Sequence, residues 1–281
     1  MNKYFSGEYL YGDDFTIEQI KKWYEDEAEA YSNLRNEAEH HYRYYYHQLN
    51  WQHGFKYLKQ INFENVLGIG AAWGHEFLPI IDKIKNLTII EPSKRLRSEK
   101  IRNITPNYVM PEIDGKICMP DDTFDLVTSF GTLHHIPNVS FVIAELYRVT
   151  KPGGHILIRE PIISMGDWTK PRKGLTKHER GIPLNIFRSI CLQLHAEIVC
   201  QTYCFTMTAL FQRAWKKLSK RPIFSFGVYV WFDKWFSHML KKNLKYHATT
   251  KLGRIAPQSV FYVLRKPLDL NSPSATEKCL N

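Results

Sequence analysis

The stretch VLGIGAAWG, residues 66–74, decides the fold. A short apolar run ends here in a glycine-rich turn, and residues 75–84 continue with the pattern of a helix. Gly70 and Gly74 let the backbone turn tightly and approach a ligand closely. A glycine pair alone is as typical of a packing turn as of a nucleotide site. The residue at the end of the next strand distinguishes these two interpretations.

Glu91 lies 21 residues after Gly70, directly after the apolar run of residues 87–90. An acid at the carboxyl end of the second strand accepts hydrogen bonds from both ribose hydroxyls in nucleoside-binding folds. Taken alone, Glu91 would also fit an exposed acid at a strand end. Together with the glycine turn, it predicts a nucleoside site.

Short apolar runs and helical patterns alternate along the rest of the chain. Near-continuous apolar strands separated by helices are typical of an α/β fold with a mainly parallel sheet covered on both faces. We expect helices at 93–101, 140–150 and 183–195. The seven predicted strands are 66–69, 87–90, 108–110, 124–130, 155–160, 196–205 and 259–264.

The domain organisation follows from this alternation. Residues 1–60 are predicted to form an N-terminal helical cap, and residues 61–205 the nucleoside-binding core. A helical insertion, rich in aromatic and basic residues, is expected at 206–253, before the last core strand within 254–266. The polar residues 267–281 are predicted to be a loose tail.

Charge is distributed unevenly along the chain, which carries a net +10. Residues 1–164 carry 18 Lys and Arg against 22 Asp and Glu, whereas residues 165–281 carry 20 against 6. The C-terminal part is therefore predicted to face something anionic: a phosphorylated substrate, a membrane surface or a nucleic acid. A merely solvated basic face explains the excess equally well.

The apolar runs and the cysteines indicate the cellular location and whether a metal is expected. No apolar run is long enough for a membrane span, and the first 14 residues do not form an apolar signal region. The five Cys are odd in number and scattered, which favours reduced thiols in a cytoplasm. Because Cys and His lack zinc-site spacing, no metal is predicted.

Four motifs, in order and spacing, resemble the class I S-adenosylmethionine-dependent methyltransferases of the ubiquinone-methyltransferase-like group. They are the glycine turn, Glu91, MPDDTFDLV at 119–127 and LYRVTKPGG at 146–154; LHHIP at 133–137 also fits. The resemblance covers about a third of the chain. It implies a Rossmann-like methyltransferase fold, S-adenosyl-L-methionine as cofactor and methyl transfer as the activity.

The resemblance also implies the cofactor-binding residues. Glu91 would hold the ribose, Asp114 the adenine amine, and the end of the fourth strand would lie beside the sulfonium. The full set is Gly68, Gly70, Ala72, Gly74, Glu91, Asp114, Ser129 and Phe130.

This chain departs from the family at three points. Gly68 stands where the family has an acid that helps to hold the cofactor's ammonium group, and Ala72 stands where it has a third glycine. Glu76 and the N-terminal acids are candidate substitutes for the missing acid. The segment from Asp114 to Phe124 is one residue shorter than usual.

Candidate catalytic residues follow the fourth and fifth strands. A hydroxyl acceptor needs a base to take its proton, and a histidine is best suited near neutral pH. His134 and His135 lie just beyond the fourth strand, and Glu160 ends the fifth at the same edge. The alternative is that the histidines pack beneath their loop and that Glu160 forms an ion pair.

Residues 165–181 form a connection longer than the fold needs, and long loops at this edge often carry function. Its basic residues suit phosphate or carboxylate, and its tryptophan suits a sugar or a ring. The predicted substrate-binding residues are Trp168, Arg172, His178 and Arg180. A solvated loop without a ligand is the alternative.

Three hypotheses for the activity differ in the acceptor. The leading hypothesis is a hydroxyl oxygen of a small molecule or glycan, with phosphorylated compounds among the candidates, because the N-terminal segment and the Arg159-Glu160-Pro161 strand end are similar to bacterial methyltransferases of polysaccharide gene clusters. An RNA methyltransferase and a non-catalytic interaction protein are the alternatives; nucleic acid is disfavoured because no RNA-binding module is recognisable. Residues 206–253 fit a peripheral membrane contact, a cap over the acceptor, or a helical pair that buries its own aromatic side chains.

Overall fold

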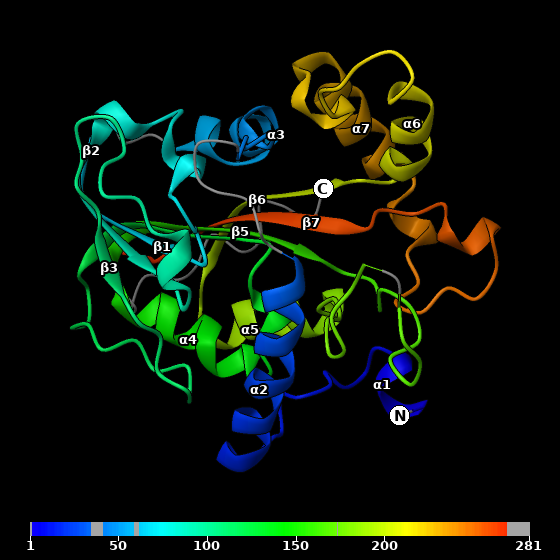
Figure 1. Ribbon diagram of the computed structural model, residues 1–281, viewed down its shortest axis with the longest axis horizontal. Helices are drawn as coiled ribbons and strands as arrows, with labels where there is room; N and C mark the ends of the chain where they lie inside the picture. Colours follow the sequence, from blue (N-terminus) through cyan, green and yellow to red (C-terminus); the bar gives the residue numbers. More distant parts are fainter. Residues whose placement is uncertain (1, 35–41, 59–61, 173, 269–281) are drawn as a thin grey trace.

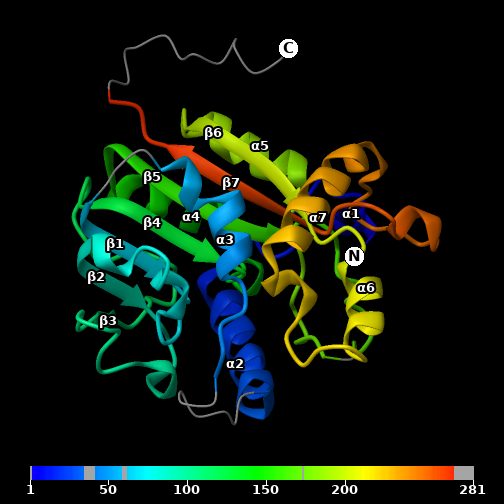
Figure 2. The ribbon, with the colours of Figure 1, turned by 90° about the horizontal axis from the view of Figure 1, so that it is seen from above.

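The computed structural model describes residues 2–34, 42–58, 62–172 and 174–268. Its centre is one seven-stranded sheet in the order β3-β2-β1-β4-β5-β7-β6, with β1 to β5 parallel and β7 antiparallel to both neighbours (Figures 1 and 2). The mainly parallel seven-stranded sheet predicted from the sequence is confirmed. The strands are β1 Phe63–Ile69, β2 Ile84–Ile90, β3 Asn107–Val109, β4 Phe124–Phe130, β5 Thr150–Pro161, β6 Glu197–Cys204 and β7 Ser259–Arg265.

Helices cover both faces of the sheet. Figure 1 shows α4 and α5 on one face, and α3, α6 and α7 on the other. The helices are α1 Asn2–Phe5, α2 Ile17–Leu34, α3 His47–His53, α4 Val139–Val149, α5 Leu184–Gln193, α6 Thr208–Trp215 and α7 Gly227–Met239. The last two lie inside the predicted insertion at 206–253.

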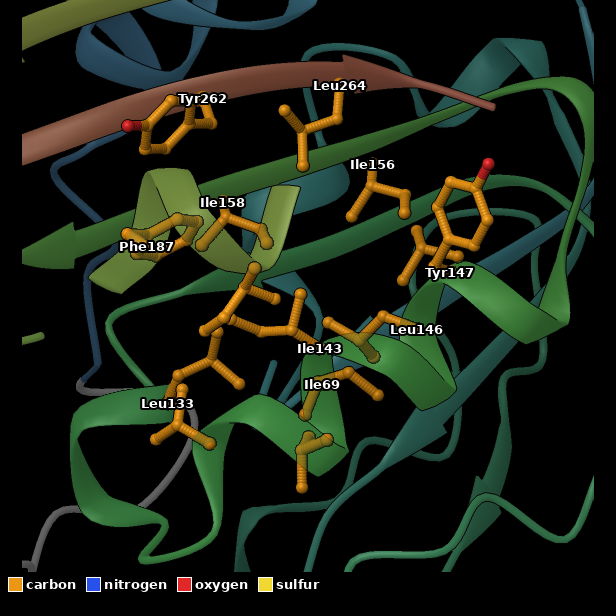
Figure 3. Packing of buried hydrophobic residues seen from close by; sticks show 14 of the residues in the cluster. Ile69, Leu133, Ile143, Leu146, Tyr147, Ile156, Ile158, Phe187, Tyr262 and Leu264 are labelled. Carbon is orange, nitrogen blue, oxygen red and sulfur yellow. The ribbon is translucent and has the colours of Figure 1, made fainter. Parts of the chain in front are cut away.

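Two hydrophobic clusters fill the space between the sheet and its helices, because successive strand residues point to opposite faces. On β4, Leu126 belongs to one cluster and Val127 to the other, and both are fully buried. Figure 3 shows the cluster beneath β5 and β7, where α4 and α5 supply the facing side chains. The sheet is therefore rigid at its centre, and the ends of its strands can hold side chains in fixed positions.

Two predicted helices are wrong. The segment 75–84 contains only single 3-10 turns, His75–Phe77 and Ile81–Lys83, and β2 already begins at Ile84. Pro79 lies between the two turns and cannot donate the hydrogen bond that a continuous helix would need. The segment 93–101 contains only the turn Lys94–Leu96.

The remaining expectations concern the two ends of the chain and the membrane. The N-terminal helices α2 and α3 lie within the predicted cap. Most of the predicted loose tail, from residue 269 onward, lies outside the described residues. Among the helices that the structure describes, none combines the length and the apolar character required to cross a bilayer.

Candidate cofactor and acceptor site

The glycine turn after β1 has a backbone that side chains would obstruct. Gly70 has a φ of +62°, and a Cβ there would lie 2.5 Å from the side chain of Thr132. Gly74 has a φ of +70°, and a Cβ there would lie 2.3 Å from Cδ1 of Ile101. Ala72 takes the left-handed conformation too, with a φ of +47°, so the backbone shape survives where the family has its third glycine.

Glu91 ties this turn to the end of β2. Its side chain is buried, and Oε2 accepts the N–H of Ala72 at 3.2 Å while Oε1 accepts the N–H of Ser93 at 3.0 Å. A carboxylate oxygen can accept more than one hydrogen bond, so capacity remains for ribose hydroxyls. The acid and the turn that the sequence predicted as one site do lie together.

Gly68 leaves no room for the acid that the family carries at this position. A Cβ on Gly68 would lie 2.9 Å from the ring of Phe77 and 3.0 Å from Cβ of Ala71. Phe77 therefore fills the space that a side chain at position 68 would need.

A carboxylate reaches the same place from the following segment. Glu76 is only 4% exposed, and its Oε1 accepts the hydroxyl of Thr128 at 2.7 Å. Thr128 lies on β4 directly opposite Gly68 on β1. Burial raises the pKa of Glu76 to about 7, although the Thr128 hydroxyl and the charge of Arg159 act in the opposite direction.

The remaining predicted cofactor residues, Ser129, Phe130 and Asp114, differ in burial and in their contacts. The hydroxyl of Ser129 is buried and has no hydrogen-bond partner among the described residues. Phe130 packs against Phe261, with ring centroids 5.3 Å apart. Asp114 is exposed on the loop after β3, where its carboxylate accepts the N–H of Lys116.

The site fits S-adenosylmethionine on three of these observations. The positive φ angles at the turn leave a backbone surface without side chains, Glu91 offers carboxylate oxygens to a ribose, and Glu76 offers a buried carboxylate to an ammonium group. The carboxyl ends of β1, β2 and β4 bring these groups to one edge of the sheet (Figure 2).

Glu160, at the end of β5, organises the segment after β4. It is fully buried, and its carboxylate accepts the N–H groups of Thr132, Leu133 and His134 at 2.8, 2.9 and 3.3 Å. The same carboxylate lies 2.7 Å from Nδ1 of His134. With its oxygens engaged in this way, Glu160 fixes the turn Leu133–His135, here called the histidine turn.

His134 lies between two carboxylates. Its Nδ1 contacts Glu160, and its Nε2 lies 3.4 Å from Oε1 of Glu179. Burial lowers its pKa, but the hydrogen bonds and charges of the two carboxylates outweigh burial and raise the pKa to about 9. His134 is therefore protonated at neutral pH and cannot accept a proton there.

His135 has the opposite character. Its side chain is 19% exposed, and Nδ1 lies 3.3 Å from the buried Glu27 of α2. Burial and the positive charge of His134 lower its pKa, and these effects outweigh the opposing influence of Glu27 and Glu179. A neutral imidazole next to a charged one is thus held at the end of β4.

The predicted substrate residues of the long loop contact protein atoms. Trp168 is buried, donates Nε1–H to the carbonyl of Ser164 at 2.7 Å and stacks on Phe5. Arg180 is fully buried and donates to the carbonyls of Tyr11, His134, Ile136 and Pro137. These contacts give Arg180 a structural role, since its donors hold the histidine turn against the N-terminal segment.

Arg172 and His178 are also engaged. Arg172 donates to the carbonyls of Met165, Thr176 and Lys177. Nε2 of His178 lies 2.8 Å from Asp26, and its ring stacks on Trp23 of α2 at 4.5 Å. Both side chains remain partly exposed, so substrate contact through Arg172 and His178 stays a prediction.

Sequence reasoning missed the acids that complete this site. Glu27 of α2 meets His135 of the histidine turn, and Asp26 of α2 meets His178 of the loop, each across more than 100 residues of sequence. Glu179 of the loop meets His134. No local motif marks α2 as a partner of the loop. The sequence predicted that residues 1–60 form a helical cap, but nothing in it indicated which side chains of α2 would reach the loop and the histidine turn.

Comparison with known proteins agrees with this geometry. Residues 67–158 match the family model described as a methyltransferase domain. Sterol 4-C-methyltransferase strm-1 of Caenorhabditis elegans is 33% identical over 118 residues, which are 39% of this chain and 35% of that protein. Demethylmenaquinone methyltransferase of Streptomyces griseus is 48% identical over 73 residues, which are 25% of this chain and 30% of that protein.

The fold is shared more widely than the sequence. The crystal structure of an S-adenosylmethionine-dependent methyltransferase from Mesorhizobium loti superposes with a TM-score of 0.51 at 16% identity, covering 77% of this chain and 97% of that one. The chain spans about a third of the length of the curated relatives it matches. Residues 67–158 thus carry a methyltransferase domain, and the chain shares its fold with an S-adenosylmethionine-dependent methyltransferase.

Proposed function

We propose that the chain transfers the methyl group of S-adenosylmethionine to a hydroxyl oxygen of a small-molecule or glycan acceptor, with His135 as the general base. The observation that carries the proposal is the pair of unlike histidines at the end of β4: His135 is held neutral beside the protonated His134. A neutral imidazole is the group that can take a hydroxyl proton at physiological pH.

The cofactor residues would act by binding and orientation. Glu91, which accepts the N–H of Ala72, would also accept hydrogen bonds from the ribose hydroxyls, and Glu76 would face the ammonium group because position 68 carries no acid. Bound S-adenosylmethionine supplies a methyl carbon already activated by its sulfonium. The remaining task of the protein is to align the acceptor oxygen with the carbon–sulfur bond and to exclude water.

The proton of the acceptor follows a defined path. As the new carbon–oxygen bond forms and the carbon–sulfur bond breaks, His135 takes the hydroxyl proton on one ring nitrogen. Glu27, at 3.3 Å from Nδ1, stabilises the imidazolium that results. Glu160 and Arg180 act as positioning residues, because they hold the backbone of the histidine turn and present no free group to the acceptor.

The reaction is proposed to need no metal. Three side chains of metal-binding types, His134, His135 and Glu179, bring one ligand atom each within 4.8 Å of one another. A protonated His134 between Glu160 and Glu179 already places a positive charge among these carboxylates. Full activity of the purified enzyme in excess EDTA supports this part of the proposal, and loss of activity restored by a divalent cation contradicts it.

The first test is calorimetric titration of the wild type and Glu91→Ala with S-adenosylmethionine and S-adenosylhomocysteine. Glu64→Ala is the matched control, because Glu64 is an exposed acid on β1 that pairs with Lys85 at the far end of the sheet. Micromolar binding that is lost in Glu91→Ala and kept in Glu64→Ala supports the cofactor site. A folded wild type that binds neither compound contradicts the proposed activity.

Acceptor screening follows cofactor binding. Phosphorylated and glycosyl compounds come first, because the C-terminal part carries the positive charge of the chain. An O-methylated product in the wild type and its absence in His135→Asn would support the hydroxyl assignment. Methylation at carbon or nitrogen would keep the enzyme class and overturn the acceptor atom.

A further inference from the structure

Helix α7 presents an unusual distribution of side chains. Its inward face, against β6 and α3, buries Val230, Asp233 and Ser237. Its outward face exposes large apolar side chains instead: Val228 is 83% exposed, Trp231 65%, Trp235 54% and Met239 62%. On a helix of 3.6 residues per turn these four residues form one narrow stripe opposite the buried face. We call them the α7 stripe.

An exposed apolar stripe on a helix requires a partner, since a helix of a soluble protein normally turns such residues inward. Isolated exposed apolar residues are ordinary, but two tryptophans three and seven positions after an exposed valine are a continuous surface. Tryptophan is also the side chain enriched at the boundary between lipid and water, where its ring is apolar and its N–H stays hydrated.

The charge around the stripe is one-sided. Residues 206–253 contain ten Lys and Arg and a single acid, Asp233. That acid is buried and accepts the N–H groups of Phe205 and Thr206, so it does not face outward. Directly after α7, Lys241, Lys242 and Lys245 are all exposed. The surface that surrounds the stripe is therefore positive.

A cavity of about 320 Å³ opens beside the stripe. Trp231 and Trp235 form part of its wall, and no acidic residue lines it; the other lining residues are Gln52, Lys56, Thr202, Tyr203, Lys234 and His238. The ammonium groups of Lys56 and Lys234 lie 5.2 and 5.0 Å from the same ring, that of Tyr57. Two ammonium groups thus lie near one ring, and no carboxylate of the cavity wall neutralises them. The cavity therefore favours an anionic ligand.

We propose that the α7 stripe and the adjoining cavity form a docking surface for a membrane that contains anionic phospholipid. The stripe enters the interface between headgroups and acyl chains, and Lys56, Lys234 and His238 meet the headgroup phosphate. The positive rim supplies long-range attraction, and the two tryptophans supply the apolar contact. A protein partner would explain the stripe but not the acid-free cavity beside it.

Vesicle co-sedimentation of the full chain tests this proposal. The probes are phosphatidylcholine vesicles and phosphatidylcholine vesicles that contain phosphatidylglycerol. The wild type is expected to bind the anionic vesicles at least about tenfold more tightly than the neutral ones, and less tightly as salt is raised. Soluble glycerol phosphate separates the two sources of phosphate: it should compete only weakly, because it lacks the apolar contact.

Two variants and two controls sharpen the test. Trp231→Ala with Trp235→Ala, and Lys56→Gln with Lys234→Gln, are each expected to weaken anionic vesicle binding about tenfold or more. Leu192→Ala, at a 61% exposed residue of α5, and Lys94→Gln with Lys100→Gln, both exposed, should bind as the wild type does. Circular dichroism and thermal melts show whether each variant is folded.

Three outcomes overturn the proposal. They are a wild type that binds neither kind of vesicle, tryptophan variants that bind as well as the wild type, and a self-association in solution that the tryptophan variants abolish while vesicles have no effect. The last outcome would assign the stripe to a second copy of the chain. Because vesicle binding needs no cofactor, it can fail while S-adenosylmethionine binding succeeds, and the reverse.

Discussion

At the scale of single residues, Gly68 stands where the family has an acid, and Glu76 is the nearby acid proposed to replace it. The ring of Phe77 fills the space beside Gly68, and Glu76 places its carboxylate on Thr128 of the adjacent strand. A buried carboxylate costs free energy unless a positive group meets it. The ammonium group of the cofactor would meet that need, which is why we assign the ammonium contact to Glu76.

Glu76→Gln should weaken S-adenosylmethionine binding about tenfold to a hundredfold, the range expected for a lost hydrogen bond to a charged group. Because the pKa of Glu76 is about 7, the wild-type affinity should rise about tenfold between pH 5.5 and 7 as the carboxylate ionises. Calorimetry at both pH values measures this rise, and Glu76→Gln should flatten it. An unchanged pH dependence in the variant would remove Glu76 from the ammonium contact.

The same residue gives a stability prediction of opposite sign. The pKa of Glu76 is raised from 4.5 to about 7 in the folded chain, so folding favours the protonated form. Its contribution to stability is present below pH 4.5 and is lost as the pH rises through 7. Glu76→Gln should therefore be at least as stable as the wild type at pH 8, as measured by urea unfolding. Reduced stability at pH 8 would show that the ionised carboxylate is paired in the folded protein.

The two histidines should respond differently to substitution. His135→Asn is expected to lower kcat about a hundredfold to ten-thousandfold and to leave S-adenosylmethionine binding unchanged, because a general base contributes that range to the rate. In His134→Asn the charge that lowers the pKa of His135 is gone, so the acid limb of the pH–kcat profile should move to higher pH. Unaltered kcat in His135→Asn would exclude it as the base.

At the scale of elements, the end of β5 holds the segment after β4 in place. Glu160, whose side chain is fully buried, accepts three backbone N–H groups and contacts His134. Glu160→Gln breaks a buried charge pair, which typically costs about 3–5 kcal/mol. Urea unfolding should show that loss, and the exposed Glu64→Gln should show almost none. A loss below about 1 kcal/mol in Glu160→Gln would mean that the turn is held by other contacts.

Elements with strong local signals were predictable, and those set by distant contacts were not. The seven strands follow from apolar runs, and the glycine turn with Glu91 follows from spacing. The helix expected at 75–84 is absent, since Pro79 interrupts it. Arg180 and Trp168 carry side chains typical of ligand binding, yet both are buried by the N-terminal segment, and no local pattern reports such a contact.

At the scale of the whole molecule, the proposed acceptor site is assembled from four separate parts of the chain. Helix α2 supplies Asp26 and Glu27, the histidine turn follows β4, Glu160 ends β5, and the long loop supplies residues 177–179. Asp26 of α2 contacts Lys177 and His178 of the loop, and Trp23 of α2 stacks on His178. The two should therefore order or loosen together, because each holds the other by charged contacts around the site.

Asp26 is the contact through which this coupling can be tested. Its carboxylate lies 2.7 Å from Nζ of Lys177 and 2.8 Å from Nε2 of His178, and its side chain is only 15% exposed. Hydrogen bonds from Lys177 and His178 hold the pKa of Asp26 well below its usual range. A lowered pKa means that the stabilisation is present above the ordinary pKa of 3.8 and is lost as the pH falls below it. The contact is therefore intact at neutral pH.

Asp26→Asn should raise amide hydrogen exchange in α2 and in residues 165–182 together at pH 7, and leave the strands of the sheet unchanged. The expected increase is about tenfold, because about 1–2 kcal/mol of local stability is removed. Asp82→Asn is the control, since Asp82 forms an exposed pair with Arg102 far from the site. Faster exchange in the loop alone would show that α2 is held by its own packing on Trp23, and the two parts of the acceptor site would then move independently.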